Sequence, residues 1–155
     1  MDACTALAES IERLAQRGHS DRRFLKELGR AAGVRRGILW VPDAATGGRN
    51  LLKGRGFRRR VDDDTSGQAR HFAGMVAVTS RLGGRLTRWA SIHVGRDAPD
   101  TADGRLTEDA IEFSRLVLSG ELAQTDAADW VRGHLCAGGG TAASGGSGPT
   151  AASGS

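Results

Sequence analysis

The fold is decided by residues 62–82, which read DDDTSGQARHFAGMVAVTSRL. Three acidic residues open this stretch, Ser66 and Gly67 follow, and the remainder is largely apolar. The side chains that recur there at helical spacing are Phe72, Met75, Val76, Thr79 and Leu82. We therefore predict a helix over residues 67–82, capped by Ser66, at the centre of the hydrophobic core.

Further helical segments lie on both sides of this stretch, and the alternation typical of strands is nearly absent. The predicted helices cover residues 4–17, the stretch between the cap Ser20 and Gly33, residues 85–94, the stretch between the cap Thr107 and Gly120, and the stretch after the cap Thr125. Residues 34–41 fit either a short helix or a short extended piece, which Pro42 closes. The sequence predicts an all-α protein, a compact bundle of five to six short helices.

The end of the chain differs in composition from the rest. Residues 138–155 are almost entirely Gly, Ala, Ser and Thr, which cannot bury enough apolar area to offset their chain entropy. We predict a disordered low-complexity tail there and a single helical domain over residues 1–137. Aromatic residues are only 5% of the chain, so the core must be aliphatic and Ala-rich. The aromatic residues expected to anchor it are Phe24, Trp40, Phe57, Phe72, Trp89, Phe113 and Trp130.

Charge is unevenly distributed along the chain, whose net charge is +4. Residues 1–61 hold 14 of the 22 basic residues and 6 of the 18 acidic ones, so the remainder is net negative. This asymmetry predicts either attraction between the two halves or a basic face for an anionic partner, nucleic acid or an acidic protein surface.

The two cysteines, Cys4 and Cys136, lie near the two ends of the predicted domain. We expect no secretory leader, because no basic-plus-apolar segment opens the sequence, and no apolar run is long enough to span a bilayer. We therefore expect a cytoplasmic protein without a membrane partner, in which the cysteines are reduced. A disulfide between the ends is the alternative that spacing leaves open.

Residues 28–34, LGRAAGV, are followed by Leu39 and Trp40. Over residues 18–41 the chain resembles the helix-turn-helix of tetracycline-repressor-type regulators, in which an Ala-Gly-Val turn precedes the recognition helix. The resemblance implies that Arg35 and Arg36, with Arg30, face the phosphates or the major groove of DNA. Without the resemblance, the same residues form an ordinary helix C-terminus.

A second candidate site surrounds the start of the central helix. Gln68 and His71 are three residues apart and share a helical face, and Asp64 lies just before the helix. A carboxylate beside an imidazole can orient it as a general base, so these residues define a hydrolase hypothesis. The alternative is a core histidine bonded to a backbone carbonyl.

Two further patterns carry less chemistry. Asp97, Asp100 and Asp103 are three residues apart, which does not match a calcium loop, and we interpret them as a loop leading into a helix. Neither the histidines nor the cysteines have the spacing of metal ligands, and no cofactor motif is present. We expect a small non-catalytic binding or interaction module, with DNA binding and hydrolysis at His71 as the alternatives.

Overall fold

The computed structural model describes residues 2–34, 49–90, 92 and 100–138. This part of the chain contains helices and one isolated β-bridge, without a β-strand, so the predicted all-α class is confirmed. The helices are α1 (Ala3–Ala15), α2 (Asp21–Ala31), α4 (Gln68–Leu82), α5 (Gly84–Ala90), α6 (Ala102–Ser119) and α7 (Ala127–His134). The predicted tail lies outside the described residues, except for residue 138.

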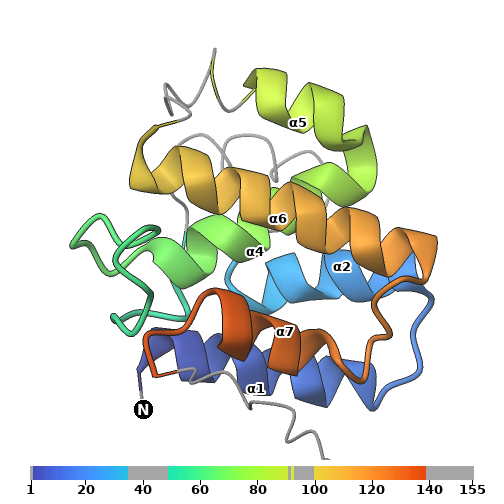
Figure 1. Ribbon diagram of the computed structural model, residues 1–155. Coiled ribbons are helices and arrows are strands. Elements are labelled where there is room, and N and C mark those ends of the chain that lie inside the picture. The colour runs from blue at the N-terminus through green and yellow to red at the C-terminus, as the bar shows by residue number, and fades with distance from the viewer. Residues whose placement is uncertain (1, 35–48, 91, 93–99, 139–155) are drawn as a thin grey trace, which may run out of the picture.

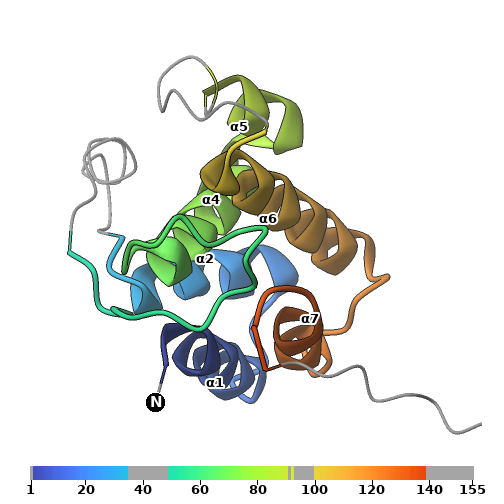
Figure 2. The ribbon, with the colours of Figure 1, turned by 60° about the vertical axis from the view of Figure 1, so that its left-hand side comes forward.

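Helix α4 lies at the centre of the bundle, where it packs against α2 and α6 (Figures 1 and 2). Helix α1 lies beside α7 and also contacts α2. Phe24, Phe72 and Phe113 are fully buried between these helices, and the rings of Phe72 and Phe113 meet edge to face at 5.5 Å. The apolar stripe in the quoted stretch therefore builds the core, as its periodicity indicates.

A small residue allows α2 and α4 to approach closely. A Cβ added at Gly29 would lie 2.4 Å from the Cβ of Ala77 and 3.2 Å from the carbonyl oxygen of Ala73. No side chain fits between two backbones at this separation, so Gly29 sets the distance between the helices. The inner face of α2 is thereby held close to the central helix.

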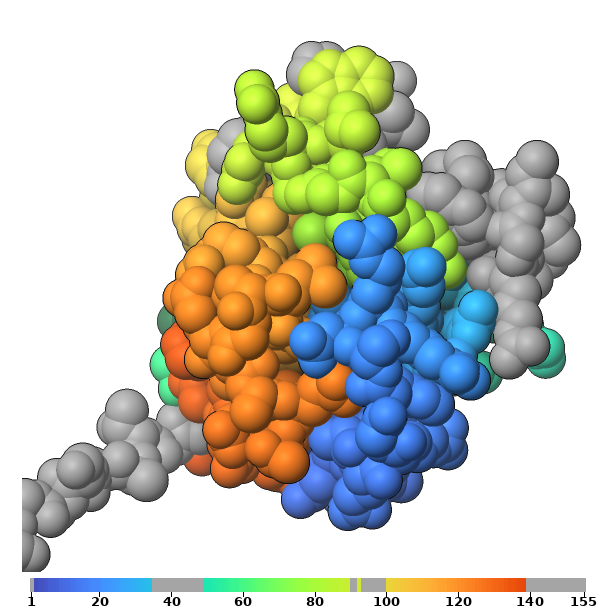
Figure 3. Space-filling view, turned by 90° about the vertical axis from the view of Figure 1, so that its right-hand side faces the viewer, coloured from blue at the N-terminus to red at the C-terminus, as the bar shows by residue number. Residues whose placement is uncertain are grey.

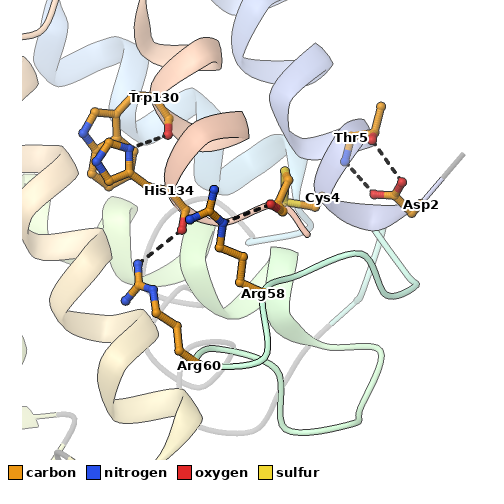
Figure 4. Close-up of a disulfide and its surroundings, with 8 residues drawn as sticks. Asp2, Cys4, Thr5, Arg58, Arg60, Trp130 and His134 are labelled. Atoms are coloured by element: carbon orange, nitrogen blue, oxygen red, sulfur yellow. Dashed lines mark hydrogen bonds between the residues drawn. A yellow bond between two sulfur atoms is a disulfide. The ribbon is translucent and has the colours of Figure 1, made fainter. Parts of the chain in front are cut away.

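The two ends of the described chain are joined covalently, because Cys4 and Cys136 form a disulfide (Figure 4). The reduced pair expected from the sequence is wrong. The reason is long-range packing: α1 and α7 lie side by side, so the ends of these helices meet, with 5.5 Å between the two cysteine Cα atoms. Sequence spacing carries no information about this contact.

Residues 55–61, which we name the clasp, bind the start of α1 and the residues that follow α7. The backbone N–H of Ala3 donates to the carbonyl of Arg55 at 2.8 Å, and that of Ala137 donates to Gly56 at 2.8 Å. Arg58 adds a bond from its own N–H to the carbonyl of Leu135 at 2.7 Å. Its Nε also donates to the carbonyl of Cys136 (Figure 4). The disulfide is thus flanked by a hydrogen-bonded loop.

Three predicted helix starts differ from the structure. Gly67, not Ser66, is the N-cap of α4, and the carbonyl of Ser66 instead accepts from the side chain of Asn50 at 2.9 Å. Helix α6 begins at Ala102, because Thr101 accepts from the N–H of Gly104 and supplies the cap assigned to Thr107. Asp126 holds the cap position of α7 in place of Thr125, without a side-chain cap bond.

Helix α5 and the end of α4 leave two of the expected core side chains exposed. Trp89 was expected to anchor the core, but its side chain is 56% exposed, and Leu82 at the end of the central stripe is 41% exposed. Trp40 and the ambiguous segment 34–41 lie outside the described residues, apart from the buried Val34. Trp89 is therefore not one of the core aromatics.

Candidate functional site

The face that α4 turns toward α6 carries two of the predicted site residues. His71 is half-buried, and its Nε2 lies 2.9 Å from Oγ1 of Thr107. One turn earlier, Gln68 is almost fully buried and donates from Nε2 to the carboxylate of Asp103 at 3.3 Å. The structure thus pairs each of these two residues with a polar group on α6.

Asp64, the third member of the predicted set, lies elsewhere. It is exposed, has a left-handed backbone conformation with φ of 65°, and forms an ion pair with Arg55 at 2.6 Å. The structure therefore does not bring Asp64 to His71. The missed partners of the cluster are Asp103 and Thr107, which sequence reasoning had placed in a loop and at a helix cap.

The chemistry open to this cluster is limited by burial. Thr107 is only 2% exposed, so a substrate cannot reach the hydroxyl group that contacts His71. Within the described residues, no three His, Cys, Asp or Glu side chains are placed to hold a metal ion. The polar groups instead satisfy one another between two packed helices, as buried polar groups generally do.

The second predicted site begins on α2, whose two faces differ sharply. Its inner face is formed by four buried residues, Phe24, Leu25, Leu28 and Gly29. Its outer face carries Arg30, which is half-buried and forms an ion pair with Glu27. Arg35 and Arg36, the other predicted nucleic-acid contacts, lie outside the described residues.

The outer face of α2 borders a shallow hollow of about 450 Å³. The hollow is lined by Ser20, Arg22, Arg23, Lys26, Glu27 and Arg30. No ion pair involves Arg22, Arg23 or Lys26 among the residues that the structure describes. Glu27, the acidic side chain of the lining, is already paired with Arg30. The hollow therefore has an excess of positive charge.

Arg81, in the last turn of α4, extends this positive charge beyond α2. Its guanidinium donates to the carbonyl of Ala77 at 2.9 Å. Desolvation, and then repulsion from the nearby Arg30, lower the pKa of Arg81. We name the residues Arg22, Arg23, Lys26, Arg30 and Arg81 the basic face; Figure 3 shows α2 in blue on the same side of the molecule as the green end of α4 and α5.

A third group of charges lies beside the clasp. Asp109 of α6 has its Oδ2 2.8 Å from Nη2 of Arg60, and Arg60 also donates to the carbonyl of His134 (Figure 4). Desolvation raises the pKa of Asp109, although the Arg60 charge opposes the shift. The ring of His134 stacks on Trp130 at 4.2 Å. These contacts fasten the clasp to α6 and α7.

Comparison of the chain with protein-family models, with curated proteins and with solved structures finds no match. The resemblance of residues 18–41 to a helix-turn-helix therefore stays a prediction. In the part of the chain that the structure describes, every helix is too short or too polar to cross a lipid bilayer.

Proposed function

We propose that the protein is a non-catalytic binding module that holds an anionic partner on its basic face. The observation that carries the proposal is the hollow along α2, where Arg22, Arg23 and Lys26 lie together without an acidic partner among the described residues. Cations held close together on a rigid helix repel one another, and a bound anion relieves that repulsion. The partner expected there carries several closely spaced negative groups.

Arginine favours phosphate as the anion. Its planar guanidinium donates two parallel hydrogen bonds to a phosphate or a carboxylate, and it loses little hydration in doing so. Three of the four cations that line the hollow are arginines. Duplex DNA presents phosphates in this way, and the resemblance of residues 18–41 would place Arg35 and Arg36 beside the same surface.

A hydrolase centred on His71 receives no such support. Its Nε2 contacts a buried threonine, and the acid that was to orient it, Asp64, pairs with Arg55. A catalytic imidazole needs a route to substrate. We assign this cluster to packing between α4 and α6.

The disulfide indicates the redox conditions of the cellular compartment in which the protein works. Disulfides persist in oxidising surroundings and are rare in the cytoplasm. The Cys4–Cys136 bond therefore favours an oxidising compartment for this protein over the cytoplasm expected from its sequence.

The test is a salt titration of binding to random-sequence duplex DNA and to inorganic polyphosphate. The variant Arg22→Ala/Arg23→Ala/Lys26→Ala should lose roughly tenfold or more in affinity at low salt, and its salt slope should fall by about 2 to 3. The matched control is Arg13→Ala/Arg115→Ala/Arg132→Ala, which removes the same charge from ion-paired surface positions on three other helices. Equal losses in the two variants would contradict the proposal.

The DNA alternative has a test of its own. If residues 34–41 form a recognition helix, Arg35→Ala/Arg36→Ala should weaken the binding of duplex DNA more than the binding of polyphosphate. The reason is that only DNA has a groove for the helix to enter. An equal loss of affinity for the two ligands would contradict a recognition helix at residues 34–41.

A further inference from the structure

Helix α5 packs with its small residues inward and its large apolar residues outward. A Cβ added at Gly84 would lie 2.8 Å from Cγ2 of Ile111 on α6, and Thr87 is fully buried. On the opposite side, Leu86 and Trp89 are each 56% exposed. Figure 1 shows α5 at the outer edge of the bundle, next to α6. The largest apolar side chains of the helix are therefore more than half exposed.

Two neighbouring residues enlarge this surface. Leu82 at the end of α4 is 41% exposed, and Ile92 just after α5 is 39% exposed. We name Leu82, Leu86, Trp89 and Ile92 the apolar patch. Single exposed hydrophobic residues are ordinary, but a group on one short helix and its flanks indicates a surface that something covers.

Among the residues that the structure describes, cations flank the apolar patch. Arg85 is exposed on α5, and Arg81 precedes the patch by one residue. Glu108 of α6 lies beside α5 but is paired with Arg88. Helix α2, which carries four of the five residues of the basic face, is visible in Figure 3 on the same side of the molecule as α5. Arg30 lies near enough to Arg81 to lower the pKa of that side chain. Exposed hydrophobic residues that include Trp, with Arg beside them, match the headgroup region of an anionic bilayer.

We propose that the apolar patch and the basic face together bind the surface of a membrane that contains anionic phospholipid. The cations contact lipid phosphates, while Leu86 and Trp89 enter the boundary between headgroups and acyl chains. This assignment rests on the proposed function and names its partner. A peripheral contact of this kind needs no helix that crosses the bilayer.

The apolar patch decides between this partner and nucleic acid. Duplex DNA would satisfy the arginines through its phosphates but would leave Leu86 and Trp89 in water. A lipid surface satisfies both parts, because phosphates lie directly above an apolar layer.

The experiment measures binding of the full chain, with its disulfide intact, to vesicles. We expect binding to vesicles of phosphatidylcholine and phosphatidylglycerol, mixed roughly three to one, and little binding to pure phosphatidylcholine. Tryptophan fluorescence of the unmodified protein should shift to shorter wavelength on binding, and Leu86→Ser/Trp89→Ser, which keeps Trp40 and Trp130, should lose that shift. Leu86→Ser/Trp89→Ser should reduce binding roughly tenfold or more, since each side chain loses its place in the apolar layer.

The matched control is Leu51→Ser, which replaces a leucine that is 60% exposed outside the apolar patch and should bind as the unmodified protein does. Far-UV circular dichroism checks that the variants keep their helices. Leu86→Ala/Trp89→Ala, which keeps good helix formers, serves if the serine variant does not fold.

The outcomes separate this inference from the proposed function. If Leu86→Ser/Trp89→Ser binds vesicles as tightly as the unmodified protein, or if duplex DNA binds and vesicles do not, the lipid assignment is overturned. The proposed function survives that result as long as Arg22→Ala/Arg23→Ala/Lys26→Ala still weakens polyanion binding. If that charge variant binds polyphosphate and vesicles like the unmodified protein, the proposed function itself fails.

Discussion

Cys4, in the first turn of α1, is bonded to Cys136, which follows α7 and lies 132 residues further along the chain. The bond closes almost the whole described chain into one loop. A crosslink of this length strongly restricts the unfolded chain. It therefore belongs among the largest single contributions to the stability of this small helical protein.

Removing the bond should cost stability without changing the fold. We expect Cys4→Ser/Cys136→Ser to lower the free energy of unfolding by about 2–5 kcal/mol. Urea denaturation followed by circular dichroism measures the change. Dithiothreitol should destabilise the unmodified protein by a similar amount and leave the double variant unaffected. A double variant as stable as the oxidised protein would show that the bond contributes nothing.

The contact of Gly29 with α4 makes a second prediction. Gly29→Ala should destabilise the protein by about 1–3 kcal/mol, because the new methyl group must push α2 away from Ala77. Gly74→Ala is the matched control, since its Cβ would approach only Val34, at 3.9 Å. That change should be neutral or stabilise α4 by about 0.5–1 kcal/mol. Thermal unfolding of both variants tests the prediction, and equal effects would contradict it.

The bond between His71 and Thr107 can be tested by an isosteric change. Thr107→Val keeps the buried volume but removes the hydroxyl group, so we expect a loss of about 1–2 kcal/mol. Thr125→Val, at an exposed position, should change stability by less than about 0.5 kcal/mol. Chemical denaturation at neutral pH gives both values. If Thr107→Val leaves the free energy of unfolding unchanged, His71 must find another hydrogen-bond partner in the variant.

Asp109 makes the stability depend on pH. Desolvation raises its pKa in the folded protein above the ordinary value of 3.8, so the folded state holds this proton more tightly than the unfolded state. As the pH rises from below 3.8 toward neutrality, ionisation of Asp109 therefore lowers the free energy of unfolding. The asparagine in Asp109→Asn cannot ionise, so this variant does not lose stability in this way as the pH rises.

Urea denaturation across pH 3 to pH 7 checks the sign of the effect. The difference in unfolding free energy, Asp109→Asn minus the unmodified protein, should be more positive at neutral pH than in acid. A difference that becomes more negative toward neutral pH would mean that the ion pair with Arg60 outweighs desolvation.

Periodicity and cap residues predicted the helices, because a helix depends on residues close together in the sequence. The stripe from Phe72 to Val76 identified the central helix, because one helical face must be apolar to enter a core. Thr107 misled the assignment of α6, since a threonine followed by acidic residues fits a helix start equally well inside a longer helix. Thr101, six residues earlier, has the same cap chemistry and is the one used.

Contacts between segments that are distant in the sequence could not be predicted from it. The pairing of Cys4 with Cys136 depends on how α1 meets α7, and that of Gln68 with Asp103 depends on how α4 meets α6. The spacing of Leu86 and Trp89 predicts a helix but not which side faces the core. In the structure, Gly84 lies against Ile111 of α6 and Thr87 is fully buried, so this side of the helix faces the core.

The clasp and the disulfide also determine how the molecule would respond to mechanical load. A force applied between residues just outside Cys4 and Cys136 is transmitted through a covalent bond, which bypasses the helices between them. A tether at either end could therefore be pulled against the other without unfolding the bundle. After reduction, the same tension would act first on the hydrogen bonds of Arg55, Gly56 and Arg58.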